Sequence, residues 1–197
     1  MNGFLWLNKL GATAAAGLSV VIRQTFYHGN YALIGEDLQP NPDFWVSVLY
    51  KKLVGRKVLK IKGHENTGNT LRLFAHCGKE IPRSRQDRQI VLFGLNMSNR
   101  TETVKFENDI FKVTEYVLSP GDGNISSRAI FMKMDDPPDF KKILKLEEGW
   151  RVPHLSGVKN GGPITELSIG PFEMGFWTYS PIESSETSDH VKTCMDP

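Results

Sequence analysis

The sequence predicts two parts of different fold class, an α/β unit at the N-terminus and a larger all-β domain after it. Residues 1–57 show helical periodicity, then a strand-like run, then helical periodicity again. Residues 58–197 instead hold short β-type runs separated by Gly, Asn and Pro turn signals. The chain has 197 residues, of which 40% are hydrophobic and 23% are charged, and this composition is ordinary for a globular protein.

The first part is expected to fold in the order helix, strand, loop and helix. Its first apolar residues are spaced by three and four positions, which predicts one helix face that Gly17 ends; they are Phe4, Leu7, Leu10, Ala14 and Leu18. Residues 19–27 are rich in β-branched and aromatic side chains and predict a strand buried on both sides, as in a parallel sheet. The loop 28–42 follows, and Asp43 is the predicted N-cap of the second helix. This order predicts the C-terminal end of a (β/α)8 barrel over residues 1–57.

The second part is predicted to be a C-terminal antiparallel β-sandwich over residues 58–197. Six strands are expected, at Val58–Lys62, Leu71–Cys77, Ile90–Asn96, Phe111–Ser119, Ala129–Met134 and Phe172–Tyr179. Turn signals such as Asn66–Asn69 and Asn160–Pro163 separate them. Short strands at this spacing are typical of a sandwich.

Charge is divided unevenly along the chain. Residues 1–90 hold 13 Lys and Arg against 6 Asp and Glu, whereas residues 91–197 hold 11 against 16. The excess of positive charge lies mainly in residues 51–88 and could attract a polyanion, or it could be a solvated face that folding scatters over several surfaces. No aromatic side chains alternate with these basic residues in the way that single-stranded nucleic acids require, so we expect no nucleic-acid partner.

Two cysteines and three glycosylation sequons indicate an extracellular protein. Cys77 and Cys194 could form one disulfide or remain two buried thiols. The sequons begin at Asn96, Asn99 and Asn124. Residues 4–22 form an apolar stretch that is too short and too interrupted for a transmembrane helix, and it lacks the basic start of a signal peptide. We therefore expect that the export signal lies upstream of this sequence.

Several segments of the chain resemble the C-terminal part of the heparanase family, and the resemblance covers nearly the whole chain. These segments are residues 4–11, 20–24, 29–31, 42–59, 71–77, 96–101 and 171–177. The resemblance implies a TIM barrel followed by a β-sandwich, in agreement with the reading above. It also implies an endo-β-glucuronidase that cuts heparan sulfate.

The resemblance implies no catalytic residue within this sequence. The family's retaining mechanism uses two glutamates, an acid/base in an Asn-Glu pair and a nucleophile in a Gly-Glu-Thr strand end. The sequence contains neither motif on a predicted barrel strand, so we expect the chain to begin just after the nucleophile and to be inactive alone. Glu36 and Asp37 are adjacent acids of the barrel loop and are expected to be solvated.

Other site residues follow from the resemblance position by position. It implies that Gln24, Gly29 and Tyr31 hold the sugar beside the scissile bond, and that Cys77 and Cys194 form the family's disulfide. Asn99 matches a family sequon, whereas Asn96 and Asn124 rest on the sequence pattern alone. Arg23 is expected to form a structural salt bridge.

Three functions remain open from the sequence. The chain could be part of a hydrolase whose glutamates lie upstream, part of a heparan sulfate-binding relative that does not cut, or an incomplete product without a function of its own. Its expected partners are heparan sulfate or a related glycosaminoglycan and the missing N-terminal part of the barrel. The expected location is secreted, in the extracellular matrix or lysosomal. No cofactor is expected, and no metal, because the five histidines are scattered without ligand spacing.

Overall fold

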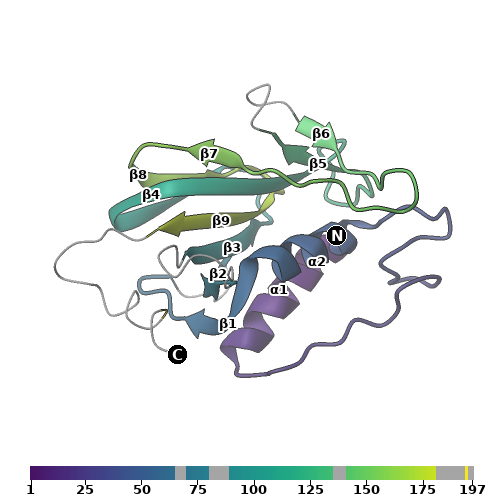
Figure 1. The fold of residues 1–197 in the computed structure, drawn as a ribbon, viewed down its shortest axis with the longest axis horizontal. Helices are drawn as coiled ribbons and strands as arrows, with labels where there is room; N and C mark the ends of the chain where they lie inside the picture. The colour runs from purple at the N-terminus through teal and green to yellow at the C-terminus, as the bar shows by residue number, and fades with distance from the viewer. Residues whose placement is uncertain (65–69, 80–88, 135–140, 181–193, 195–197) are drawn as a thin grey trace.

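Two helices lie against one face of a large antiparallel sheet, as Figure 1 shows. The computed structural model describes residues 1–64, 70–79, 89–134, 141–180 and 194. The elements are α1 (Asn2–Ala15), α2 (Pro42–Leu53), β1 (Val54–Leu59), β2 (Leu71–Gly78), β3 (Ile90–Asn96), β4 (Glu102–Pro120), β5 (Ile130–Lys133), β6 (Lys141–Ile143), β7 (Val158–Asn160), β8 (Ile164–Ile169) and β9 (Met174–Ser180).

The strands pair in the order β1-β2-β3-β9-β4-β5-β6, and β7 and β8 both pair with β4. Every pairing between these strands is antiparallel. The last described strand, β9, lies between β3 and β4 and so occupies the middle of the sheet. The antiparallel class predicted for residues 58–197 is confirmed.

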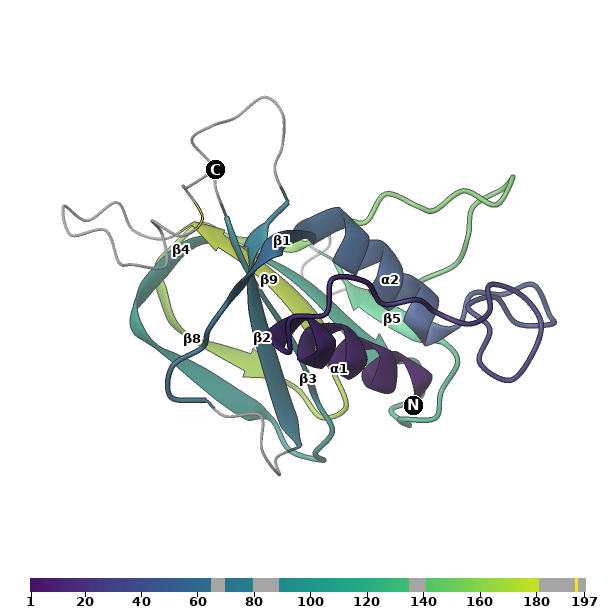
Figure 2. The same cartoon turned by 90° about the horizontal axis from the view of Figure 1, so that it is seen from below.

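The long strand β4 bends and serves two layers. Its pairings with β9 and with β8 both shift register near its middle, and Lys112 there has a positive φ of 51°. From Phe111 onwards β4 pairs with β9, β5 and β7; before Phe111 it pairs with β8 alone among the described strands. Figure 2 shows β4 curving round with β8 beside it, across the face opposite the helices.

The sheet is buried on both faces, which explains its two hydrophobic cores. Side chains of β2 and β3 alternate between them. Phe74 and Phe93 belong to the core shared with α1 and α2, whereas Leu73 and Leu92 belong to the core shared with the first half of β4 and β8. A strand between two cores must be apolar at consecutive positions, and every residue of β3 is buried.

Helix α1 ends as its sequence predicts. Gly17 has φ +82°, its N–H bonds to the carbonyl of Ala14, and the N–H of Leu18 bonds to the carbonyl of Thr13. This pair of hydrogen bonds is the Schellman motif, in which glycine is favoured because its left-handed backbone has no Cβ to strain. Earlier in the helix, Gly11 lies directly against the Phe74 ring, and a Cβ at Gly11 would stand 2.2 Å from it.

The predicted strand over residues 19–27 is wrong for this structure. The segment is irregular, and its Val20 and Ile22 side chains are 73% and 81% exposed. A parallel strand needs a hydrogen-bonded neighbour on each side. Within the described residues, this segment has only an isolated bridge between Tyr27 and Ile34. The helices on either side form as predicted, but the structure does not confirm a barrel remnant.

Other differences concern element ends. Helix α2 begins at Pro42 with Asn41 as its N-cap, so Asp43 lies in the first turn and not at the cap. The first strand of the β-domain begins at Val54, four residues earlier than predicted. The strands β6, β7, β8 and the first half of β4 were not predicted. The domain boundary at residue 57 stays a prediction, and β1 runs across that position.

His76 of β2 links the helices to the sheet and gives a testable pH dependence. Its Nδ1 lies 3.0 Å from the Gly55 carbonyl oxygen, which only an N–H can approach as a donor. The ring is 2% exposed and packs against Phe93 and Tyr50. Burial lowers the pKa of His76, and the Gly55 carbonyl partly opposes this effect.

We expect acid to destabilise the chain through His76. Because the folded pKa of His76 is lowered, the unfolded imidazole takes up its proton at a higher pH, near 6.5, than the buried imidazole does. In that pH range the unfolded state binds more protons than the folded state. The free energy of unfolding therefore decreases as the pH is lowered, by at most about 1.4 kcal/mol per pH unit for this group. Between pH 7 and pH 5, the wild type should lose more free energy of unfolding than His76→Gln in urea titrations. Equal losses in the two proteins would show that His76 is protonated in the folded chain.

Candidate functional site

The segment 18–41, which carries the predicted sugar-binding residues, is attached to the domain at both ends. At its start, the guanidinium of Arg23 forms an ion pair with the Asp43 carboxylate and lies 5.1 Å from the centre of the Trp6 ring. Asp43 is fully buried. Burial raises the pKa of Asp43, and the neighbouring Arg23 opposes this shift. The structural salt bridge predicted for Arg23 is therefore present.

The end of the segment is held by Asn41 and by the loop between β4 and β5. Asn41 donates from Nδ2 to the Ala32 carbonyl at 2.7 Å and accepts from Arg128 Nε at 3.0 Å. Arg128 also donates to Asp37 at 3.0 Å. The backbone hydrogen bond from Gln39 lowers the pKa of Asp37 most, and the hydrogen bond and the charge of Arg128 lower it further. The loop is thus clamped between α2 and the sheet domain.

The predicted sugar-binding residues are exposed at the surface of this segment. Gln24 and Gly29 are exposed, and Tyr31 is 61% exposed. Gly29 has φ +106°, a conformation that favours glycine. The segment turns back on itself through hydrogen bonds from Leu33 to Thr25 and from Ile34 to Phe26. The structure places all three on one anchored segment, but none of them lines either of the two cavities described below.

The adjacent acids Glu36 and Asp37 are solvated, as expected. Glu36 is 77% exposed and lies 3.7 Å from His28, while Asp37 is half exposed and pairs with Arg128. Both side chains are therefore surface acids of this loop.

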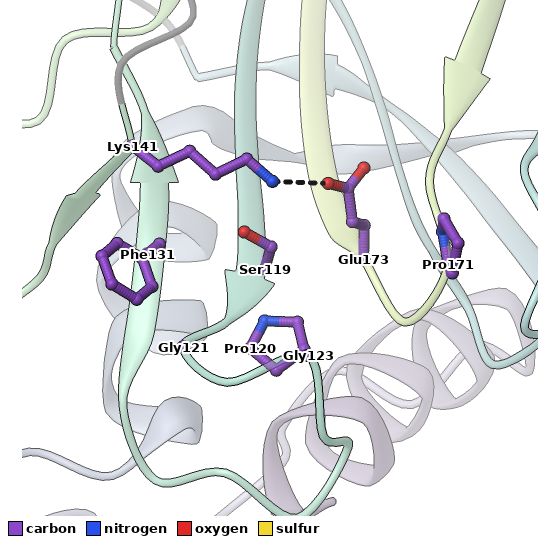
Figure 3. Close-up of a pocket in the computed structure, with 8 residues that line it drawn as sticks. All are labelled: Ser119, Pro120, Gly121, Gly123, Phe131, Lys141, Pro171 and Glu173. Atoms are coloured by element: carbon purple, nitrogen blue, oxygen red, sulfur yellow. Dashed lines mark ion pairs between the residues drawn. The ribbon is translucent and has the colours of Figure 1, made fainter.

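Sequence reasoning missed a cavity of mixed polar and apolar lining on the β-domain, shown in Figure 3. It has a volume of about 440 Å³ and adjoins a second cavity of about 220 Å³, with which it shares Ser119, Lys141 and Glu173. The other residues lining the larger cavity are Pro120, Gly121, Gly123, Phe131 and Pro171. No sequence motif predicts this cavity. Its residues come from β4, β5, β6 and the turn before β9, and these segments are brought together only by the sheet topology.

The smaller cavity has a half-buried acid, Glu115, in its lining. Burial raises the pKa of Glu115, while Lys133 and the Trp177 indole oppose this shift and Glu173 adds to it. Ser168 and Val117 complete the lining of this cavity. The two cavities together therefore carry two lysines and two glutamates.

Cys77 and Cys194 form a disulfide that spans 117 residues. The sequons differ in accessibility. Asn99 and Asn124 are exposed, whereas Asn96 is fully buried and donates from Nδ2 to the carbonyls of Ile169 and Gly170. A glycan on the same nitrogen is incompatible with this arrangement, so the expectation for Asn96 does not hold in this fold. Glycosylation at Asn99 and Asn124 stays a prediction.

The basic segment 51–88 is partly used for internal contacts. Lys52 donates to the Leu155 carbonyl at 2.6 Å and lies over the Tyr116 ring, and burial lowers the pKa of Lys52. Lys79 donates to the Lys51 carbonyl at 3.1 Å. Arg83, Arg85 and Arg88 lie outside the described residues. Among the described residues, no group of His, Cys, Asp or Glu could hold a metal ion. Neither described helix has the length and hydrophobicity needed to cross a membrane.

Comparisons with known proteins agree with the resemblance seen in the sequence. No family model matches the chain. The chain is 35% identical to the heparanase of Mus musculus over 181 residues, which are 89% of the chain and 32% of the relative. It is 32% identical to the hyaluronoglucuronidase of Hirudo nipponia over 91% of the chain and 36% of the relative. It is also 33% identical to the inactive heparanase-2 of Homo sapiens over 92% of the chain and 32% of the relative.

The chain thus spans about one third of the length of the curated relatives it matches. That share agrees with the expectation that it corresponds to their C-terminal part. An identity of 33% to 35% over about nine tenths of its residues makes this chain a homologue of about one third of the heparanase sequence.

Proposed function

We propose that the chain is the C-terminal part of a heparanase-like endo-β-glucuronidase that hydrolyses heparan sulfate. The observation that carries the proposal is the 35% identity to a heparanase over 89% of the chain. The chain contributes sugar contacts from Gln24, Gly29 and Tyr31 and holds the segment that carries them on a folded β-domain. The two glutamates of the reaction come from the part of the barrel that precedes it.

The anchoring of the segment supports the positioning role. Arg23 precedes Gln24 directly, and its ion pair with the buried Asp43 fixes the backbone from which Gln24 projects. A Gln amide can both donate to and accept from sugar hydroxyls, and a Tyr can stack on a ring and donate a hydrogen bond. The exposure of Gln24 and Tyr31 leaves both side chains free to contact a glycan. Fixed contacts of this kind lower the entropic cost of orienting a substrate.

A second candidate function is binding of heparan sulfate without cleavage. It is favoured by the 33% identity to an inactive heparanase-2, which nearly equals the identity to the heparanase. The residues described here serve either function, because neither function depends on a carboxylate of this chain. We propose a secreted, matrix or lysosomal location for both, on the strength of the homology and the disulfide.

The proposal is tested by transplanting the chain. A chimera consists of the Mus musculus heparanase with its matching third replaced by this chain. We expect it to depolymerise heparan sulfate, and Tyr31→Ala in the chimera to raise KM about tenfold, which corresponds to about 1.4 kcal/mol of lost binding. Gel filtration of the digested polymer measures both effects.

Tyr27→Ala is the matched control, because Tyr27 is also an exposed aromatic of this segment but has no role in the proposal. It should leave KM unchanged. A folded chimera that binds heparan sulfate without shortening it would support the second candidate. Equal effects of the two tyrosine variants would contradict the assignment of Tyr31.

A further inference from the structure

The larger cavity of the β-domain combines charged, hydroxyl and apolar groups in its lining. Its volume of about 440 Å³ falls in the range of ligand pockets. Three strands and two turns supply its walls, so the cavity depends on the strand order of the sheet and not on one loop. Figure 3 shows Lys141 and Glu173 facing each other across it, with Ser119 beside them.

Glu173 is fixed in place before any ligand arrives. Its Oε2 accepts from the Gly170 N–H at 2.8 Å, and its side chain is only 17% exposed. Its Oε1 lies 3.5 Å from Lys141 Nζ, which is longer than a well-formed N–H···O hydrogen bond. The Lys141 side chain is half exposed. The ammonium group is therefore held near the cavity but retains donors that a ligand could use.

Apolar and hydroxyl groups complete the lining. The Phe131 ring and the prolines Pro120 and Pro171 supply flat apolar surface, and Figure 3 shows them around the polar centre. The Ser119 hydroxyl is buried at the cavity wall. A few convergent polar groups on an apolar surface are typical of sites for small polar ligands.

The charges of the lining balance. The larger cavity has one lysine and one glutamate, and the adjoining cavity adds Lys133 and Glu115. A strongly anionic ligand would gain from the lysines but be repelled by the glutamates. Sugar hydroxyls both donate and accept, so they match carboxylate acceptors and ammonium donors together.

We propose that this cavity binds a neutral pyranose unit of a saccharide. The hydroxyls of the ring donate to Glu173 and accept from Lys141 and Ser119, and its apolar face packs on Phe131. The site differs in chemistry from the heparan sulfate contacts proposed above, because that polymer is anionic. It involves none of the residues 24–31, so it stands or falls separately from the proposed function.

The same sugar could reach the cavity from two sources. One is a free saccharide. The other is the N-acetylglucosamine core of a glycan on Asn124, which directly follows the lining residue Gly123. Asn124 is exposed and opens a sequon.

The test uses the full chain without glycans and N,N′-diacetylchitobiose as the probe, followed by saturation-transfer NMR. We expect binding with a Kd of about 1 mM, as for a small neutral ligand, and at least a fivefold weaker affinity in Lys141→Met. The matched control is Lys142→Met. Lys142 is the next residue of β6, is exposed, and lines neither cavity.

A chitobiose Kd that is unchanged in Lys141→Met would overturn the proposal, as would no transfer to the wild type. Preference for a sulfated heparin disaccharide over chitobiose would overturn it as well, because the cavity would then be an anion site.

A second preparation of the chain, secreted with its glycans, distinguishes the two sources of the sugar. Loss of chitobiose binding in it, restored by Asn124→Gln, assigns the cavity to the chain's own glycan; equal binding in both assigns it to free saccharide. Both of these results support the site.

Discussion

Replacing Cys77 and Cys194 together by alanine is expected to lower the free energy of unfolding by about 4–5 kcal/mol. The bridge closes a loop of 117 residues, and the chain-entropy model assigns a loop of that size about this much stabilisation. Both cysteines are buried in the core between the sheet and the β4–β8 layer. For a chain of this length the melting temperature should fall by about 10 °C or more, which differential scanning calorimetry can measure.

The wild type melted in dithiothreitol is the control, because it breaks the bridge without changing a side chain. It should approach the melting temperature of the double variant. A fall of less than about 1 kcal/mol in both experiments would show that the bridge adds little to the stability of the fold.

The centre of the sheet was predictable from sequence because burial leaves a clear pattern there. Residues 90–96 are apolar at nearly every position, and β3 has the predicted bounds. This pattern arises because β3 lies between β2 and β9 and has a core on each face. Strands β2, β5 and β9 were likewise found to within two residues at either end.

The periphery of the sheet could not be predicted in the same way. Strands β6 and β7 have three residues each, and none of these residues is buried. The first half of β4 is largely exposed, with charged and polar side chains on most positions. These strands form because they pair with neighbours that are already in place, and such pairing leaves little hydrophobic signal in a single sequence.

Residues 19–27 show the opposite error, because a strand was predicted there and the structure has none. Its Val20-Val21-Ile22 sequence has the pattern of a buried strand, yet Val20 and Ile22 lie exposed. Hydrophobic periodicity indicates what a segment would bury if strands flanked it. The described residues supply only an isolated bridge to this segment, so local pattern and tertiary context disagree there.

The sugar-binding segment and the cavity also differ in how far sequence alone could predict them. Arg23, Gln24, Gly29 and Tyr31 are close in sequence, and a local motif could point to them. The cavity residues Ser119, Lys141 and Glu173 are far apart in the sequence. Only the pairing of β4 with β5 and β9, and of β5 with β6, brings them together. Without the register of these strands, no sequence argument could have selected them.

Replacing Arg23 by methionine should cost about 3 kcal/mol or more in the free energy of unfolding. Methionine keeps much of the side-chain volume but removes the cation, which leaves the fully buried Asp43 carboxylate without its partner. Removing one member of a buried ion pair is strongly destabilising for this reason. The cation–π contact with Trp6 is lost as well. Urea unfolding at pH 7, followed by tryptophan fluorescence, measures the effect.

The pH dependence of the variant identifies the cause. Burial raises the pKa of Asp43, and Arg23 is the group that opposes this shift, so in Arg23→Met the folded pKa of Asp43 should rise further above its unfolded value. A group with a raised folded pKa favours folding at low pH, and this contribution is lost as the pH increases. The deficit of Arg23→Met against the wild type should therefore shrink from pH 7 towards pH 4. Adding Asp43→Asn should recover part of the loss at pH 7, because no buried charge then remains. A deficit that is constant with pH and not relieved by Asp43→Asn would mean that Arg23 stabilises the fold through packing alone.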